Sequence, residues 1–394
     1  MVDEKLKYIG IVSCHFVHNY GSMLQVYATQ QVISNFGIKN ETINMTTFLP
    51  KLRSRQARFY LKNIYKKDLL RKIFRTTKRK FAKYLNKGIK IGFLSRDEAF
   101  RRFSLEHFEL SKPCNIAELP VFCKKYSDVL LGSDQLWLPQ NIAADYYTLS
   151  FVPRDINSVT YATSFGVSDL PSCMKPETSA FLSRIMHLSV REDTGACLVK
   201  NLTGRAAAVV CDPTILLTSA QWQEYLPPTR KSDEPYIFCY FLGNNPKHRA
   251  FANELKLKTG LKIVTLRHLD EYIASDEFFG DEAPYDVDPS DFVNYIRHAS
   301  YVCTDSFHAT VFSILNSVQF FVFMRFRGKK NTMSTNSRIG TLISLTGLEN
   351  RLVNDINQMN SLLSNPISYK EVDKRLETAR AESVSYLKNA LGIL

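Results

Sequence analysis

The sequence lacks most of the motifs that mark specialised protein classes. It has no C-x-x-C pair, no G-x-x-x-x-G-K-[ST], no G-x-G-x-x-G and no H-E-x-x-H. The sequence therefore does not indicate a zinc ribbon, a P-loop nucleotide hydrolase, a typical dinucleotide-binding site or a zincin. We predict neither a metal nor a cofactor. Long hydrophobic runs are missing too: the most apolar stretch near the C-terminus, Val318–Met324, is far shorter than the roughly 20 residues that cross a bilayer.

Signs of secretion are also missing. The eight cysteines are scattered, and the N-terminus enters a strand-like segment without the basic and apolar regions of a signal peptide. Both features predict a reduced, cytoplasmic chain. What the 394 residues do have is a globular composition, with 45% hydrophobic residues, 26 Phe and 19 Tyr. This composition excludes wholesale disorder, and the length suggests two domains of about 190 residues each.

Positive charge is concentrated in one segment. The chain carries a formal charge of +13, but residues 51–90 alone carry +15, and the other 354 residues sum to −2. Hydrophobic residues interrupt the cations at a spacing that predicts one or two amphipathic helices. A solvated helical hairpin and a peripheral contact with the inner face of the membrane or a lipid-linked substrate are both compatible with this pattern. No nucleic-acid-binding motif is present, so we predict no nucleic-acid partner.

Short apolar runs alternate with helical stretches along the chain, which is typical of parallel sheets in α/β proteins. We predict two Rossmann-like, doubly wound domains that face a cleft: residues 1–218, with a basic helical insertion at about 51–96, and residues 235–394. A polar segment containing two prolines, 219–234, is interpreted as the linker. Predicted strands are 8–16, 128–131, 158–164, 188–190, 207–210, 236–242, 262–266, 301–304 and 319–324. Predicted helices are 23–36, 176–186, 194–202, 247–259, 290–298, 308–315, 337–345 and 369–391.

Ligands in such sheets bind beyond the carboxyl ends of the strands, so the loops there are candidates for a site. In the first domain, residues 18–22 open a helix whose free N–H groups attract an anion or a sugar hydroxyl. Residues 132–137 add an Asp and a Gln for hydroxyls and Trp137 for stacking on a sugar. A plain turn with a Ser22 N-cap, and a capped helix with a core Trp137, are equally compatible with the two loops.

Two further strand ends carry charged groups. Arg191 offers a planar fork for a carboxylate or phosphate, or it forms a salt bridge with its acidic neighbours in the sequence. Residues 304–308, T-D-S-F-H, place a titratable imidazole at a helix start beside a hydroxyl and a carboxylate. Histidine suits proton transfer near neutral pH, whereas the structural alternative is an N-cap followed by a His in the first turn.

Taken together, these loops resemble the polysaccharide pyruvyl transferase family, and the resemblance runs from the first strand to about residue 340. The matching stretches are H-N-Y-G-S-M-L-Q-V-Y-A-T-Q (18–30), L-L-G-S-D-Q-L-W (130–137), S-V-R-E-D (189–193), C-D-P-T-I-L-L (211–217), D-F-V-N-Y-I-R-H-A-S-Y-V-C-T-D-S-F-H-A-T-V-F-S-I-L (291–315) and N-S-R-I (336–339).

The resemblance implies two domains arranged as in GT-B glycosyltransferases. It also implies transfer of the carboxyethylidene group of phosphoenolpyruvate to a sugar of a cell-surface polysaccharide or of its lipid-linked precursor. By match to the family's motifs, His308 is the expected general acid, Arg191 a phosphoenolpyruvate ligand and Asp134 a residue near the acceptor. A nucleotide-sugar glycosyltransferase and a non-catalytic carbohydrate-binding protein are the alternatives.

The chain departs from the family pattern at Ser306, where some branches carry Arg, and at Ala309, where Gly is frequent. The missing positive charge must then come from elsewhere, and Arg338 and Arg325 are the candidates. The predicted phosphoenolpyruvate site is Arg191, Ser306, His308, Arg325 and Arg338, with most of it in the second domain. The predicted acceptor site, in the first domain, is Asn19, Tyr20, Gly21, Ser22, Gln25, Gly132, Ser133, Gln135 and Trp137.

Overall fold

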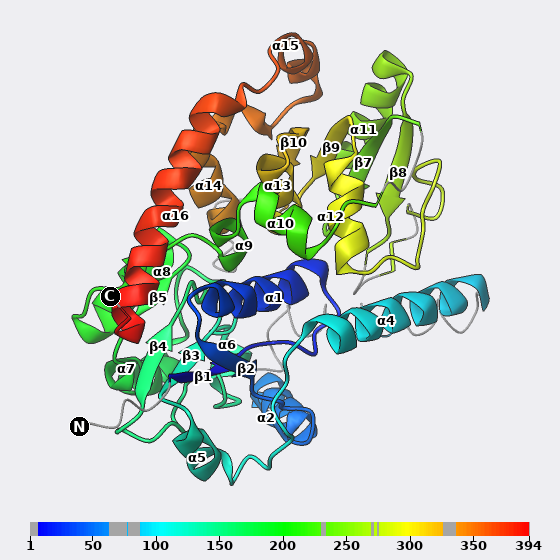
Figure 1. Cartoon of the computed structure of the whole chain (residues 1–394). Coiled ribbons are helices and arrows are strands. Elements are labelled where there is room, and N and C mark those ends of the chain that lie inside the picture. Colours follow the sequence, from blue (N-terminus) through cyan, green and yellow to red (C-terminus); the bar gives the residue numbers. More distant parts are fainter. Residues whose placement is uncertain are drawn as a thin grey trace.

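The first of two parallel sheets lies in the N-terminal half of the molecule (Figure 1). The computed structural model describes residues 7–62, 77, 87–229, 234–268, 272–273, 276–325 and 336–393. The strand order is β2–β1–β3–β4, and every pair is parallel. The strands are β1 Tyr8–Val12, β2 Lys39–Thr42, β3 Asp128–Leu131 and β4 Asn157–Thr160. A parallel pair, β5 Ser189–Val190 and β6 Ala208–Val209, continues beside β4 through isolated bridges.

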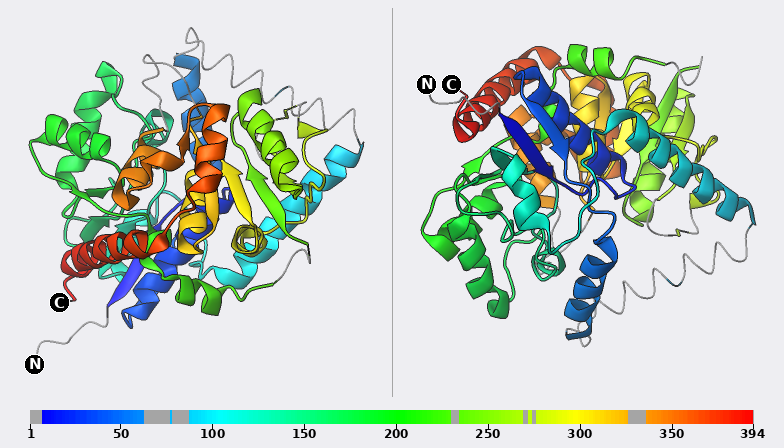
Figure 2. Two further views of the ribbon diagram at one scale, coloured as in Figure 1. Left: turned by 90° about the horizontal axis from the view of Figure 1, so that it is seen from above. Right: turned by 60° about the horizontal axis from the view of Figure 1, so that its bottom comes forward.

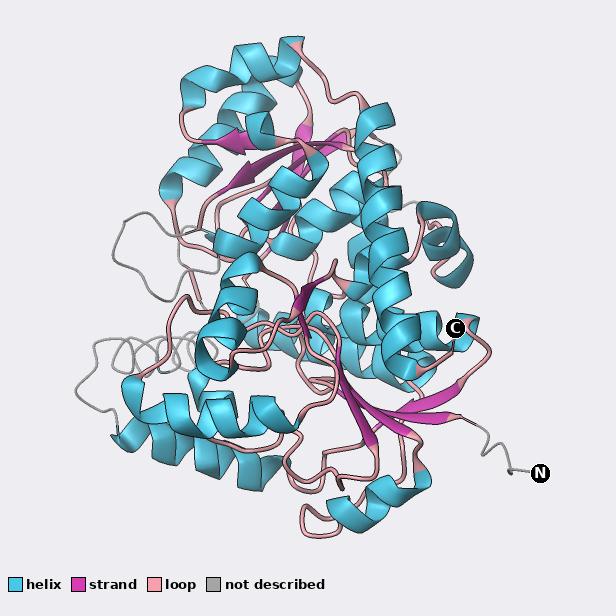
Figure 3. Cartoon of the chain, turned by 90° about the vertical axis from the view of Figure 1, so that its left-hand side faces the viewer, coloured by secondary structure: helices cyan, strands magenta, loops and turns pink. Residues whose placement is uncertain are grey.

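The second sheet has the order β11–β10–β9–β7–β8 and is also parallel. Its strands are β7 Tyr236–Tyr240, β8 Lys262–Leu266, β9 Tyr301–Thr304, β10 Gln319–Phe323 and β11 Leu352–Val353. The central strands are apolar along their length because helices cover both faces, as Figure 3 shows. The prediction of two doubly wound α/β sheets is confirmed.

Helices connect the strands of both units. Those of the first unit and its edge are α1 Tyr20–Asn35, α2 Leu49–Lys62, α4 Lys87–His107, α5 Leu119–Phe122, α6 Pro139–Ile142, α7 Lys175–Arg184, α8 Asp193–Thr203, α9 Pro213–Leu216 and α10 Ser219–Tyr225. Those of the second are α11 Pro246–Thr259, α12 Pro289–Arg297, α13 Phe307–Leu315, α14 Asn336–Thr346, α15 Met359–Ser364 and α16 Tyr369–Leu391. Short 3₁₀ turns are η1 Cys123–Lys125, η2 Ser172–Met174, η4 Glu349–Arg351 and η5 Ile356–Gln358.

Helix α1 lies at the junction of the two units. Tyr20 at its start is fully buried, stacks on Phe292 of α12 with ring centroids 4.6 Å apart, and donates a hydrogen bond to the Val287 carbonyl oxygen at 3.2 Å. One continuous hydrophobic cluster contains residues of both sheets, among them Ile9 and Val302. The units therefore share an apolar core where they meet.

Helix α16 links the units a second time, because it runs from the second unit along the side of the first (Figure 1). Near its end, the Ala390 carbonyl oxygen accepts a hydrogen bond from Asn157, the first residue of β4, at 2.8 Å. The Ser383 hydroxyl accepts one from the Cys211 backbone N–H at 3.0 Å. The end of the predicted second domain therefore packs on the first unit.

Several elements differ from their predicted bounds. Helix α1 begins at Tyr20 rather than residue 23, because the Asn19 side chain caps it by accepting from the Ser22 N–H. Helix α10 occupies the first part of the segment that we interpret as a linker. The basic segment begins in α2 and ends in α4, whereas residues 63–76 and 78–86 lie outside the described residues.

Helix α4 extends from the first unit past the second (Figure 2), where Arg96 donates a hydrogen bond to the Arg267 carbonyl oxygen at 3.0 Å. Neither α4 nor any other described helix combines the length and hydropathy that a bilayer crossing requires.

Candidate active site

Asp212 is the centre of a buried polar cluster that joins the two units. It follows β6 and caps α9, with its Oδ1 accepting hydrogen bonds from the Thr214 N–H and hydroxyl at 3.1 and 2.7 Å. Its Oδ2 accepts from Arg191 Nη1 at 2.5 Å and from the Ser133 hydroxyl at 3.0 Å. The carboxylate is 1% exposed. Arg191 therefore pairs with Asp212 rather than with its neighbours in the sequence.

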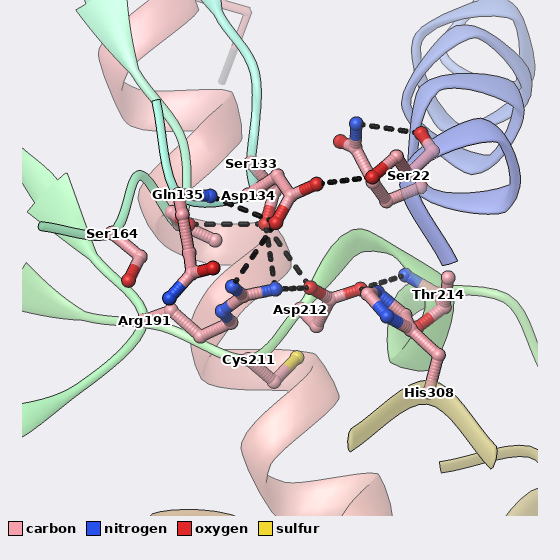
Figure 4. Close-up of polar contacts among 12 residues, drawn as sticks. Ser22, Ser133, Asp134, Gln135, Ser164, Arg191, Cys211, Asp212, Thr214 and His308 are labelled. Atoms are coloured by element: carbon pink, nitrogen blue, oxygen red, sulfur yellow. Dashed lines mark hydrogen bonds and ion pairs between the residues drawn. The ribbon is translucent and has the colours of Figure 1, made fainter. Parts of the chain in front are cut away.

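His308 approaches the same carboxylate from the second unit (Figure 4). It lies in the first turn of α13, and its Nε2 is 3.7 Å from Asp212 Oδ1. The start of α1 packs on its other side so closely that a Cβ atom on Gly21 would lie 1.9 Å from His308 Nδ1. The imidazole is thus held between the two units by a carboxylate and by a glycine backbone.

The charge state of Asp212 follows from these contacts. Burial alone would raise the pKa of the carboxyl, because desolvation disfavours the charged form. The nearby charges of His308 and Arg191 and the hydrogen bonds outweigh burial, so that the pKa of Asp212 lies well below its usual range. Asp212 is an anion at neutral pH.

Asp134 forms a second anionic point beside Arg191. Its Oδ1 accepts from the Gln135 N–H at 2.8 Å and lies 3.8 Å from Arg191 Nη2, while Oδ2 accepts from the Ser22 hydroxyl at 2.5 Å. Burial raises the pKa of Asp134, but Arg191 and other nearby cations outweigh it and the net pKa is lowered. The residue has a φ of 85°, a left-handed conformation that is uncommon outside glycine and often marks functional sites.

Two further arginines come from the second unit. These are Arg325 and Arg338. The guanidinium carbon of Arg338 lies 5.8 Å from the centre of the Phe307 ring, and that of Arg191, from the first unit, lies 4.8 Å from it. Burial and the neighbouring Arg191 charge lower the pKa of Arg338 to about 9. No carboxylate among the described residues forms an ion pair with Arg338. Arg325, in contrast, has an ion-pair partner, because its Nε lies 3.8 Å from Asp305 Oδ1. Arg338 is a buried cation without an anionic partner in this part of the chain.

A cavity of about 290 Å³ opens on the other side of Asp134. It is enclosed by the strand-end loops, by α2 and by the segment around α6, and Ser22 and Gln135 line it together with Asp134. Asp134 therefore separates this cavity from the arginine cluster. Within the described ranges, no three His, Cys, Asp or Glu side chains are grouped to hold a metal ion.

The predicted acceptor residues fall into two groups. Ser22 and Gln135 line the cavity, and Asn19 and Gly21 shape the start of α1 as described above. Ser22 does not cap the helix, as one interpretation suggested, but donates to Asp134.

The other predicted acceptor residues support the loops from behind. Gly132, Gln25 and Ser133 are buried; the Gln25 amide donates to the Ser22 carbonyl oxygen at 2.9 Å, and the Ser133 hydroxyl to Asp212. Tyr20 packs between aromatic rings at the junction. These residues position the site without lining the cavity.

Trp137 lies in the core and not at the site. It has no exposed surface, its ring packs on Phe165 and Phe181, and its indole N–H donates to the Tyr147 carbonyl oxygen at 2.9 Å. An indole enclosed in this way has no free face for a sugar, so the core interpretation of Trp137 holds and the stacking interpretation does not.

Ser306 and Arg325 also have clear structural partners. Ser306 caps α13 by accepting from the Ala309 N–H, as the N-cap interpretation of this loop suggests. Arg325 donates to the Asp305 carbonyl oxygen at 3.1 Å. Among the second-unit residues predicted to bind phosphoenolpyruvate, Arg338 and His308 form fewer hydrogen bonds with the described part of the chain than Ser306 and Arg325 do.

Asp212 was not among the predicted site residues. Its stretch, C-D-P-T, shows an Asp before a Pro, which is an ordinary helix start, and nothing local indicates contact with Arg191 or His308. Its place within a stretch that matches the family was the one signal that could have identified it.

Two parallel α/β units with a charged site at their junction define the class of GT-B-fold proteins, and solved structures of this class resemble the chain. A putative UDP-N-acetylglucosamine 2-epimerase from Listeria monocytogenes has a TM-score of 0.52 at 12% identity, covering 98% of this chain and 96% of that one. The S. aureus MnaA–UDP co-structure has 0.51 at 12%, with 98% and 97% covered. The UDP-GlcNAc 2-epimerase from Methanocaldococcus jannaschii has 0.50 at 9%, with 94% and 99% covered. At these identities the likeness shows the fold alone.

The family is shown by the sequence. The model of the polysaccharide pyruvyl transferase family matches residues 19–325, which is most of the chain and includes Asp134, Arg191, Asp212 and His308. The chain therefore belongs to the polysaccharide pyruvyl transferase family. No curated protein matches it significantly.

Proposed function

We propose that the protein is an enzyme that transfers the carboxyethylidene group of phosphoenolpyruvate to two hydroxyls of one sugar, in a polysaccharide or its lipid-linked precursor, and releases phosphate. The observation that carries the proposal is Arg338. A buried guanidinium that forms no ion pair with a described carboxylate, and that the Asp134 and Glu192 charges compensate only in part, is costly, and an anionic substrate would supply a partner. Phosphoenolpyruvate bears a carboxylate and a phosphate, which match the forks of Arg338 and Arg191.

His308 is suited to the role of general acid. Its Nε2 lies 3.7 Å from the Asp212 carboxylate, and the arginine cluster lies beside that carboxylate. Transfer of its proton to C3 of phosphoenolpyruvate turns the methylene into a methyl group and leaves C2 electrophilic. A positioned acid contributes about 10²–10⁴-fold to the rate.

Asp134 is suited to orient the acceptor. It lies between the cavity and Arg191, and it is an anion that accepts hydrogen bonds from hydroxyl groups, as it does from Ser22. One sugar hydroxyl adds to C2, and a second then displaces phosphate from the same carbon. The two C–O bonds release two protons, of which one restores His308 and the other leaves with phosphate.

The test of this proposal uses the substitution Arg338→Met. Phosphoenolpyruvate is expected to raise the Tm of the wild-type protein and to bind Arg338→Met about 10- to 100-fold more weakly, because one charge-assisted contact contributes about 1.5–3 kcal/mol. The unliganded variant is expected to be at least as stable as the wild type, because a buried unpaired charge is removed. Calorimetric titration and urea denaturation measure the two effects, and the exposed Arg154→Met is the control.

The proposal is overturned if phosphoenolpyruvate leaves the Tm of the wild-type protein unchanged, or if Arg338→Met binds it as the wild type does. Release of UDP from UDP-hexoses, without phosphate release from phosphoenolpyruvate, would instead identify a glycosyltransferase.

A further inference from the structure

The cavity beside Asp134 has the features of a binding site for one sugar. Its volume of about 290 Å³ lies just below the usual range for small-molecule sites, about 300–1,000 Å³, and suits a single pyranose ring. Met45, Leu49 and Leu52 form an apolar wall on which the carbon face of a sugar can pack. Polar side chains, among them Ser22, Asp134 and Gln135, form other parts of the lining.

Two side chains of the lining support its wall from behind. The hydroxyl of Tyr146 and the side-chain nitrogen of Gln135 are closed off from solvent and have no hydrogen-bond partner among the described residues. A Cβ atom on Gly166 would lie 2.5 Å from that Gln135 nitrogen, so the amide packs against the chain and not against a ligand. The groups of the lining that can form hydrogen bonds with sugar hydroxyls are the Asp134 carboxylate and the side-chain amides of Gln56 and Asn141.

The wall that α2 provides is strongly cationic. The helix carries five Lys or Arg and no acidic residue, and it is held against the cavity by hydrogen bonds from Arg55 to the Ala144 carbonyl oxygen at 2.8 Å and from Gln56 to Asn141 at 2.8 Å. Arg53 lines the cavity, is exposed, and has no ion-pair partner among the described residues. A free guanidinium at the opening of a sugar-sized cavity matches an anion attached to the sugar.

We infer that this cavity binds a pyranose carrying a phosphate at its anomeric carbon, with the phosphate on Arg53 and the reacting hydroxyls at Asp134. The inference rests on the proposed function, because it names the acceptor of that reaction as a glycosyl phosphate. Two sources share this chemistry, a nucleotide-linked sugar and a lipid-linked glycan. The site would hold the acceptor on the side of Asp134 opposite to Arg191, so that donor and acceptor meet at that carboxylate.

The experiment measures binding and needs no turnover. The probes are glucose, galactose and mannose 1-phosphates, the matching methyl hexosides, and inorganic phosphate. Saturation-transfer NMR measures the binding of each probe to the full chain. At least one hexose 1-phosphate is expected to bind about tenfold or more tightly than its methyl hexoside and than inorganic phosphate. Arg53→Gln is expected to abolish this preference, and Arg58→Gln, an exposed arginine of α2 outside the cavity, to retain it.

Equal binding of the phosphate and methyl compounds, or equal effects of Arg53→Gln and Arg58→Gln, overturns the inference. Binding of inorganic phosphate as tight as that of the sugar phosphates overturns it too, because it indicates an anion site without a sugar site. The UDP-linked and the prenyl-phosphate-linked forms of the sugar that binds then distinguish the two sources. The form that binds more tightly, and loses this advantage in Arg53→Gln, is the source of the glycosyl phosphate. Phosphoenolpyruvate binding through Arg338 is measured in the same samples, so a failure of this inference is separable from a failure of the proposed function.

Discussion

Gly21 brings the backbone of the first unit against the predicted acid, His308. A Cβ atom there would overlap the His308 ring at 1.9 Å, and the clash cannot be relieved cheaply because Asp212 lies on the other side. Glycine is therefore required by proximity to the imidazole and not by backbone conformation. The family stretch that contains it, H-N-Y-G-S, shows the glycine but not its neighbour.

Gly21→Ala is expected to displace His308 and to lower kcat about 10²-fold or more, approaching the effect of His308→Gln, which removes the acid. Phosphoenolpyruvate affinity should change much less, since Arg191 and Arg338 are untouched. Steady-state phosphate release and calorimetric titration provide the two measurements. Gly340→Ala in α14, where an added Cβ meets no atom within 4 Å, is the matched control and should leave kcat unchanged. Near-normal turnover of Gly21→Ala would contradict the assigned role of His308.

Side-chain identity predicted some residues of the site and misled on others. His308, Arg191 and Asp134 lie in one connected cluster, as their strand-end positions suggest. The large aromatic residues Tyr20 and Trp137 are suited to sugar stacking by type, but both are buried in packed surroundings. Whether an aromatic ring faces a core or a ligand depends on contacts from other segments, which a local pattern does not contain.

Helix α16 supports the site from outside through its contact with the loop that carries Asp212. The Ser383 hydroxyl accepts a hydrogen bond from the backbone N–H of Cys211, the residue before Asp212. Because both groups are buried, removal of the hydroxyl leaves the N–H without a partner.

Ser383→Ala is expected to lower the free energy of unfolding by about 1–3 kcal/mol and to lower kcat, because the Asp212 loop loses a fixed point. Urea denaturation and phosphate release measure the two effects. Ser385→Ala, exposed on the same helix, is expected to change neither. Equal stability and turnover for the two variants would show that α16 does not hold the loop.

At the scale of elements, hydrophobic periodicity predicted the central strands and eight of the described helices to within a few residues, whereas the edge strand β2 and short helices such as α5, α6 and α9 were not predicted. The strands β3 and β9 were predicted with the bounds they have, because apolar runs that are buried on both faces stand out from their flanks. The start of α1 was missed, because Asn19 and Ser22 are both good caps and the choice depends on Asp134, which competes for Ser22.

For the whole molecule, three carboxylates couple stability to pH, of which Asp212 and Asp305 are buried and Asp134 is half-buried. Burial raises the pKa of Asp134, Asp212 and Asp305, but neighbouring cations and hydrogen bonds outweigh it and leave all three lowered. A lowered pKa in the folded state means that the unfolded state binds protons more tightly. The stabilisation is therefore complete above the unfolded-state pKa of about 4 and is lost as the pH falls through the folded-state values.

Urea denaturation at pH 7, 5, 4 and 3 is expected to show a free energy of unfolding that falls below about pH 4. Asp305→Asn should make this decline shallower, because one of the three coupled carboxylates is gone. An increase in stability between pH 5 and pH 3, or an unchanged slope in the variant, would contradict the assignment.

The sequence by itself determined the two parallel sheets, the order of their strands along the chain and the family, because burial pattern, turns and motifs are properties of short segments. Only the tertiary structure decided that Asp212 pairs with Arg191 and lies beside His308, that Arg338 has no described carboxylate partner, and that α2 closes a cavity at Asp134. These contacts join segments that are separated in the chain, and the contact of His308 with Asp212 also joins the two units. They arise from how helices and sheets pack as whole bodies, which no single segment encodes.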